Sequence, residues 1–145
     1  WFRSIAGYLD TRFLTRQGLQ AAFHDKSKVT DDMVDLYYNM SMRAGSREAT
    51  LARFTRRRNP TPVTDADLGD LTMPALILWG ETDALIPPSA GERFASALPN
   101  AQLIVYPEVG HLPMEEHAEQ SATDLLNFLA DRPAETRTAG FNDNQ

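Results

Sequence analysis

Two short apolar runs stand out in the second half of the chain, ALILWG at 75–80 and AQLIVYP at 101–107. Each run is short, continuous and bounded by Gly, Pro or Asn, which is typical of a strand buried on both faces of a parallel sheet. Between them, residues 89–100 have the periodicity of a helix. A capping box is predicted at its start, with Ser89 as the N-cap and Glu92 at the third helical position.

A further helix is predicted directly after the second apolar run. Pro113 suits the first helical position, and apolar residues recur every three or four positions from there to about Ala130. The order strand, helix, strand, helix predicts a βαβα unit whose two strands are parallel neighbours. Because two strands alone do not form a stable parallel sheet, we expect the remaining strands to come from sequence outside this chain.

The first half of the chain has helical periodicity throughout. Helices are predicted at 10–23, 29–42 and 48–57. Thr30 is the expected N-cap of the second of these helices, since aspartates follow it in the first turn. The inner face of that helix is expected to hold Val29, Met33, Leu36, Tyr37 and Met40.

Two other segments lack such periodicity. Residues 58–74 are rich in proline and aspartate, which predicts a linker across the surface. Residues 132–145 have few large apolar side chains, which predicts a disordered tail. The chain is therefore divided into a helical part with its linker at 1–70, a βαβα part at 71–131 and the tail.

Composition limits the classes of function. The 145 residues are 42% hydrophobic and 23% charged, which is ordinary for a globular domain. Their formal net charge of −6 does not favour nucleic acid or an anionic membrane surface as a partner. The absence of cysteine excludes disulfides and a Cys nucleophile, and no apolar run approaches the ~20 residues of a membrane span. The cytoplasm is the expected location.

The start of the sequence predicts that the chain is part of a larger protein. It opens at Trp1, with neither a methionine nor the pattern of a signal peptide.

Candidate chemistry lies in the loops that leave the two predicted strands. Asp83 follows the first strand by three residues, and His111 follows the second within the sequence YPEVGHLP. A βαβ crossover places the carboxyl ends of both strands side by side, roughly 5 Å apart across the ladder. The carboxylate can then orient the imidazole, which can act as a general base and acid toward a third group.

These two motifs carry a resemblance to a known family. With Gly80-x-x-Asp83 after one strand and Gly110-His111 after the next, residues 71–130 resemble the C-terminal part of the α/β-hydrolase fold superfamily. The helical first half resembles the cap of esterase-like, epoxide-hydrolase-like and C–C-hydrolase-like members. The resemblance implies an α/β fold, namely the C-terminal βαβα part of the parallel sheet (71–131) preceded by a helical cap (1–70).

The resemblance also implies roles for residues. Asp83 is expected to be the acid and His111 the base of a catalytic triad, with no metal and no organic cofactor. The Gly-x-Ser-x-Gly elbow that carries the nucleophile in the family is absent from this sequence. We therefore expect the nucleophile in a missing N-terminal half of the same protein, and the 145 residues alone to be inactive. A small apolar ester or a related carbonyl compound is the expected substrate, and a homodimer remains open.

Flanking residues are assigned by their position. The predicted substrate pocket comprises Leu85, Ile86, Leu112, Tyr37 and Met40. Glu115 and Glu116 are interpreted as favourable charges at the positive end of a helix dipole.

Three alternatives remain open. An epoxide hydrolase or haloalkane dehalogenase would use an Asp nucleophile, and a C–C hydrolase would use Ser. A protein of the same fold could instead bind a ligand without turning it over. The first half could also be a separate helical interaction module.

Overall fold

The computed structural model describes residues 12–55 and 63–131. Predictions made for residues 1–11, 56–62 and 132–145, including the tail, lie outside these residues. The elements are α2 (Arg12–Ala22), η1 (Lys26–Lys28), α3 (Asp31–Ser41), α4 (Ser46–Thr55), α5 (Asp65–Gly69), β1 (Ala75–Gly80), α6 (Pro88–Ala97), β2 (Ala101–Tyr106), α7 (Pro113–Glu116) and α8 (Ala118–Ala130).

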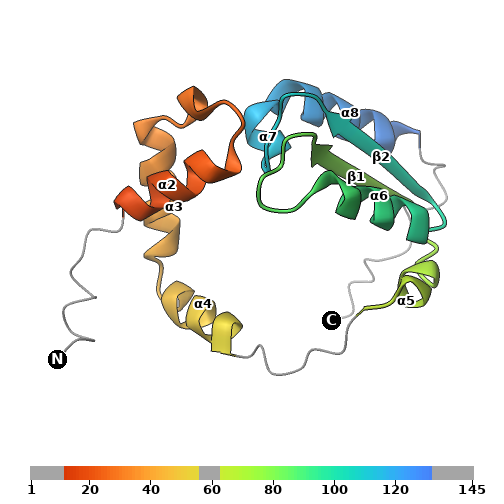
Figure 1. Ribbon diagram of the computed structural model, residues 1–145, viewed down its shortest axis with the longest axis horizontal. Coiled ribbons are helices and arrows are strands. Elements are labelled where there is room, and N and C mark those ends of the chain that lie inside the picture. Colours follow the sequence, from red (N-terminus) through yellow and green to blue (C-terminus); the bar gives the residue numbers. More distant parts are fainter. Residues whose placement is uncertain (1–11, 56–62, 132–145) are drawn as a thin grey trace, which may run out of the picture.

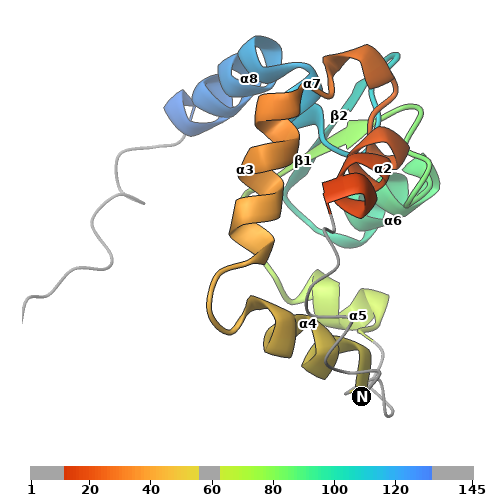
Figure 2. The same cartoon turned by 90° about the vertical axis from the view of Figure 1, so that its left-hand side faces the viewer.

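The described strands form a parallel pair, as the two apolar runs predict. β1 and β2 pair in register from Ala75 opposite Ala101 to Gly80 opposite Tyr106. Helix α6 makes the crossover and lies on one side of the strands, with α8 on the other (Figures 1 and 2). The carboxyl ends of both strands face the helical first half of the chain (Figure 1). The predicted βαβα unit is therefore present.

Two predicted helices differ from the observed ones, the first in its start and the second in its continuity. Helix α6 begins at Pro88 with Pro87 as its N-cap and has no side-chain cap bond, so the predicted Ser89–Glu92 capping box is wrong. Proline at the first helical position starts the helix one residue before Ser89. The helix predicted from Pro113 to Ala130 is interrupted at His117, whose φ of −128° is not helical.

The predicted linker contains a short helix. In α5, the Thr64 side chain accepts a bond from the Asp67 amide, and the Asp67 carboxylate accepts one from the Thr64 amide. Arg93 of α6 holds this helix through a 2.6 Å ion pair with Asp65. The predicted linker is thus helical where Thr64 and Asp67 form a capping box, and an exposed ion pair joins this helix to α6.

A small core joins the helical first half to the loop after β2. It is formed by buried Leu19, Ala22, Phe23, Val29 and Val34, with Met33, Tyr37 and Leu112 packed against it. Thr30 caps α3 as predicted, by accepting a bond from the Met33 amide.

The inner face predicted for α3 is confirmed for Val29, Met33 and Tyr37, which lie in or against the core, and wrong for Leu36 and Met40. Val34 is its buried residue, whereas Leu36 and Met40 are exposed. The packing stripe runs through Met33, Val34 and Tyr37, because the side of α3 that faces α2 decides which residues are buried.

Candidate active site

The loops that follow β1 and β2 continue the pairing of the strands beyond their ends. The amide of Glu81 donates to the carbonyl of Tyr106 at 2.9 Å, and the amide of Thr82 donates to that of Val109 at 3.0 Å. The Thr82 hydroxyl donates to the same carbonyl at 2.8 Å. Val109 is fully buried. The two loops are thus held to each other before one loop reaches Asp83 and the other reaches His111.

Two glycines allow this close approach. A Cβ added to Gly80 would lie 1.9 Å from the carbonyl oxygen of Gly110. A Cβ added to Gly110 would lie 2.2 Å from the carbonyl oxygen of Ala22, at the end of α2. The glycines of the Gly-x-x-Asp and Gly-His motifs are therefore required by backbone contacts, the second of them with the helical first half.

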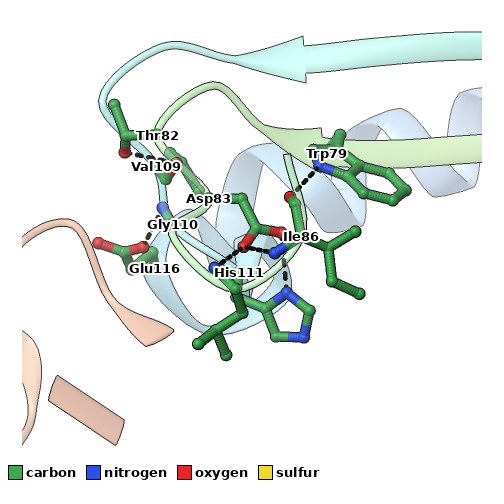
Figure 3. Close-up of polar contacts among 9 residues, drawn as sticks. Trp79, Thr82, Asp83, Ile86, Val109, Gly110, His111 and Glu116 are labelled. Atoms are coloured by element: carbon green, nitrogen blue, oxygen red, sulfur yellow. Dashed lines mark hydrogen bonds and ion pairs between the residues drawn. The ribbon is translucent and has the colours of Figure 1, made fainter. Parts of the chain in front are cut away.

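Asp83 and His111 meet between these loops. The Oδ2 atom of Asp83 lies 2.8 Å from Nδ1 of His111. The other carboxylate oxygen accepts the amides of Leu85 at 2.8 Å and Ile86 at 2.9 Å. Figure 3 shows the carboxylate between these donors and the imidazole. The two amide bonds from the same loop fix the orientation of the Asp83 carboxylate. The carboxylate in turn fixes the orientation of the His111 imidazole ring.

The electrostatics of the pair favour one tautomer. Burial by itself raises the pKa of Asp83, but the amides of Ile86 and Leu85 together with His111 outweigh it and hold the pKa below its usual value. The carboxylate is therefore ionised at neutral pH and acts only as an acceptor, so Nδ1 of His111 carries the proton. The side chain of Asp83 is 3% exposed and that of His111 33%, which leaves Nε2 as the ring nitrogen free to exchange a proton.

The five predicted pocket residues do not form one group. Leu85 and Ile86 are exposed beside the carboxylate, and Leu112 packs on the core of α2 and α3. The Tyr37 hydroxyl donates to Glu115 at 3.0 Å. Partial burial and this bond raise the pKa of Tyr37. Met40 is 46% exposed on α3.

Two residues with structural contacts at the site were missed from the sequence. Glu116 lies in the first turn of α7, as its interpretation as a helix-dipole charge requires, but its side chain is also buried and accepts backbone amides, which the sequence did not indicate. His24 lies with Nδ1 2.9 Å from the hydroxyl oxygen of Thr82. Asp25 lies 91 residues from Glu116, and Thr82 lies 58 residues from His24, so no local pattern marks these two contacts.

The remaining hollows and side-chain clusters of the described chain do not indicate a second site. An open hollow of about 550 Å³, lined by residues 24–28 with Glu108 and His117, contains none of the predicted site residues. Across 12–55 and 63–131 no three acidic or histidine side chains gather as a metal site would require. In those same ranges no helix is long and apolar enough to cross a membrane.

The chain belongs to the alpha/beta hydrolase fold family, which it matches over residues 7–118. The strand, loop and helix order described above agrees with this assignment.

Several curated relatives are hydrolases. The chain is 33% identical to the 2-hydroxymuconate semialdehyde hydrolase of Pseudomonas putida over 132 residues, which are 88% of the chain and 47% of that protein. It is 34% identical to a 2-hydroxy-6-oxononadienedioate/2-hydroxy-6-oxononatrienedioate hydrolase of Dechloromonas aromatica over 72% of the chain and 37% of that protein. The chain spans about half the length of the first of these relatives and a smaller part of the second.

Solved structures give the same fold. The meta-cleavage product hydrolase of Pseudomonas fluorescens superposes with a TM-score of 0.74 at 26% identity, over 86% of this chain and 47% of that one. A serine hydrolase involved in carbazole degradation superposes with a TM-score of 0.77 at 24% identity, over 87% of this chain and 50% of that one.

Proposed function

We propose that this chain carries the acid and the base of a hydrolase with a nucleophile–His–Asp triad. Asp83 is the acid and His111 the base. The observation that carries the proposal is the 2.8 Å contact between Oδ2 of Asp83 and Nδ1 of His111, with the carboxylate buried and the imidazole partly open. The sequence has no Gly-x-Ser-x-Gly elbow, so the proposed nucleophile lies outside the 145 residues.

The proposed reaction transfers an acyl group to water. Nε2 of His111 accepts the proton of the nucleophile as its oxygen bonds to the substrate carbonyl carbon. His111 then returns that proton to the leaving group as the bond to it breaks. A water molecule repeats the sequence on the acyl intermediate and regenerates the nucleophile. Asp83 remains ionised throughout and stabilises the imidazolium.

The relatives favour a C–C bond as the one that is cleaved. Proteins similar to this chain act on 2-hydroxymuconate semialdehyde and on 2-hydroxy-6-oxononadienedioate, as their names state. We therefore place the C–C hydrolase ahead of the ester hydrolase that the sequence first suggested. In this reaction the proton from His111 goes to a carbon leaving group rather than to an alcohol.

Exposed apolar side chains support a further part of the proposal. Val105 of β2 and Leu125, Leu126 and Leu129 of α8 all remain exposed. The described sheet has two strands. We propose that sequence outside this chain extends the sheet, covers some of these side chains and brings the nucleophile to His111.

The test uses the complete protein that contains this sequence. Hydrolysis of 2-hydroxymuconate semialdehyde and of p-nitrophenyl acetate is measured for the parent, for His111→Ala and for a matched control, His117→Ala. The proposal predicts that His111→Ala loses at least about 10³-fold in kcat while the control stays within a few-fold of the parent. A His111→Ala variant with parental activity would overturn the assignment. If the parent hydrolyses neither compound, the ligand-binding alternative is favoured.

A further inference from the structure

Glu116 holds two backbone segments that are far apart in the chain. Its Oε2 atom accepts the amide of Gly110 at 2.6 Å, and its Oε1 atom accepts the amide of Asp25 at 2.9 Å. Gly110 directly precedes His111, whereas Asp25 lies in the turn between α2 and η1. Figure 3 shows the Glu116 carboxylate directed at the Gly110 amide. The side chain therefore connects the histidine loop to the helical first half of the chain.

The connection is reinforced on both sides. The amide of His111 donates to the carbonyl of Ala22 at 2.6 Å, so the two consecutive amides of Gly110 and His111 are both held. The Lys28 ammonium donates to the backbone carbonyl of Glu116 at 2.8 Å. Because Ala22, Asp25 and Lys28 all belong to one short segment, a shift of that segment would move the backbone of His111 with it.

Burying a carboxylate is costly unless strong hydrogen bonds compensate for the lost hydration. Glu116 is only 6% exposed, and the two bonds of its carboxylate both come from backbone amides. An apolar side chain would fill the same space but leave the amides of Gly110 and Asp25 without this acceptor. The contacts thus explain why an acid occupies this position.

We propose that Glu116 is a positioning residue that sets the place of the His111 imidazole by fixing the Gly110 amide to the turn after α2. This inference rests on the proposed function, since it assumes that His111 transfers protons. It also predicts that the segment from Ala22 to Lys28 forms part of the support of the active site. If this is so, the segment from Ala22 to Lys28 has to keep its position relative to His111 while the reaction proceeds.

The chemistry of the side chain provides a sharp test. Both carboxylate oxygens accept a backbone N–H, so Glu116→Gln necessarily turns an NH₂ group toward one of two donors, whichever way the amide is oriented. The volume of the side chain is preserved. Glu119→Gln makes the same chemical change three residues later, at an exposed position on α8, and serves as the control.

The experiment compares the complete parent protein with both variants. Glu116→Gln should lower kcat by about 10- to 100-fold with KM within about threefold, because a small displacement of a catalytic group reduces the rate more than it reduces binding. Glu119→Gln should stay within about twofold of the parent. Hydrogen exchange at the Gly110 and Asp25 amides should accelerate in Glu116→Gln and not in the control. A folded Glu116→Gln variant with parental kcat would overturn the proposal.

Amide exchange separates this inference from the proposed function. It needs no substrate, so it reports on Glu116 even if the protein hydrolyses neither test compound. If Glu116→Gln does not fold, the unaltered protein decides: the Gly110 and Asp25 amides must exchange as slowly as those of β1. Fast exchange at Gly110 in the unaltered protein would show that Glu116 does not hold the loop.

Discussion

The carboxylate of Asp83 and the imidazole of His111 lie 2.8 Å apart although 28 residues separate them in the chain. One helical crossover produces this contact, because it returns the chain to the carboxyl edge of a parallel strand pair. The bonds from Thr82 to the Val109 carbonyl then hold the two loops, which carry Asp83 and His111, next to each other. The contact is therefore a property of the backbone as much as of the two residues.

Asp83→Asn tests the role of the charge, since it preserves size and removes ionisation. Without the carboxylate, His111 loses the acceptor that selects its tautomer and stabilises the imidazolium. We expect kcat of the complete protein to fall by about 10³- to 10⁴-fold, with a smaller change in KM. Asp70→Asn, at an exposed position after α5, is the matched control and should leave kcat unchanged. A loss smaller than about tenfold for Asp83→Asn would contradict the proposed role.

The stability of the protein in acid should also depend on Asp83. Its pKa is lowered in the folded state, so its charged form stabilises the fold. This contribution is fully present above the unfolded pKa of about 3.9 and is lost as the pH falls through the folded pKa.

Urea unfolding at pH 7 and pH 3 measures this contribution. At pH 7, Asp83→Asn should lower the free energy of unfolding by about 1–3 kcal/mol, as expected for a buried charged hydrogen-bond partner. At pH 3 the difference between parent and variant should shrink, because this pH lies below the unfolded pKa and protonation of Asp83 in the unfolded chain offsets part of the contribution. A difference that is constant or larger at pH 3 would show that the charged form of Asp83 does not stabilise the fold.

Gly110 and Gly18 give opposite predictions for the same substitution. Gly110→Ala places a Cβ 2.2 Å from the Ala22 carbonyl and 2.7 Å from the His24 amide, so the backbone of one segment must move. We expect a loss of about 2 kcal/mol or more in the free energy of unfolding. Gly18→Ala has nothing within 4 Å of the added carbon and lies inside α2, where alanine favours the helix by about 0.5–1 kcal/mol.

Thermal unfolding of both glycine variants provides the measurement. Tm should fall for Gly110→Ala and rise for Gly18→Ala. Equal Tm values for Gly110→Ala and the parent would mean that the contact between the histidine loop and α2 is looser than described.

Short-range patterns predicted much of the fold. The apolar run at 75–80 has the bounds of β1, and the run at 101–107 exceeds β2 by one residue. Thr30 was identified as a helix cap from the aspartates that follow it, and the donor that it caps, the Met33 amide, lies only three residues away. The proximity of Asp83 and His111 followed from the topology of a parallel crossover. These features depend on neighbouring residues or on one rule of chain geometry.

Contacts between distant segments account for what the sequence did not reveal. The Asp65–Arg93 ion pair joins α5 to α6 across 28 residues, and the buried face of α3 depends on where α2 lies. The contacts of Glu116 are the clearest case: Gly110 is six residues away, but Asp25 is 91 residues away. By itself the sequence determined the two strands, their order and the pair at their ends, because short apolar runs and the geometry of a single crossover specify them. Only the tertiary structure decided what supports that pair, because the hydrogen-bond partners of a buried carboxylate are chosen by packing.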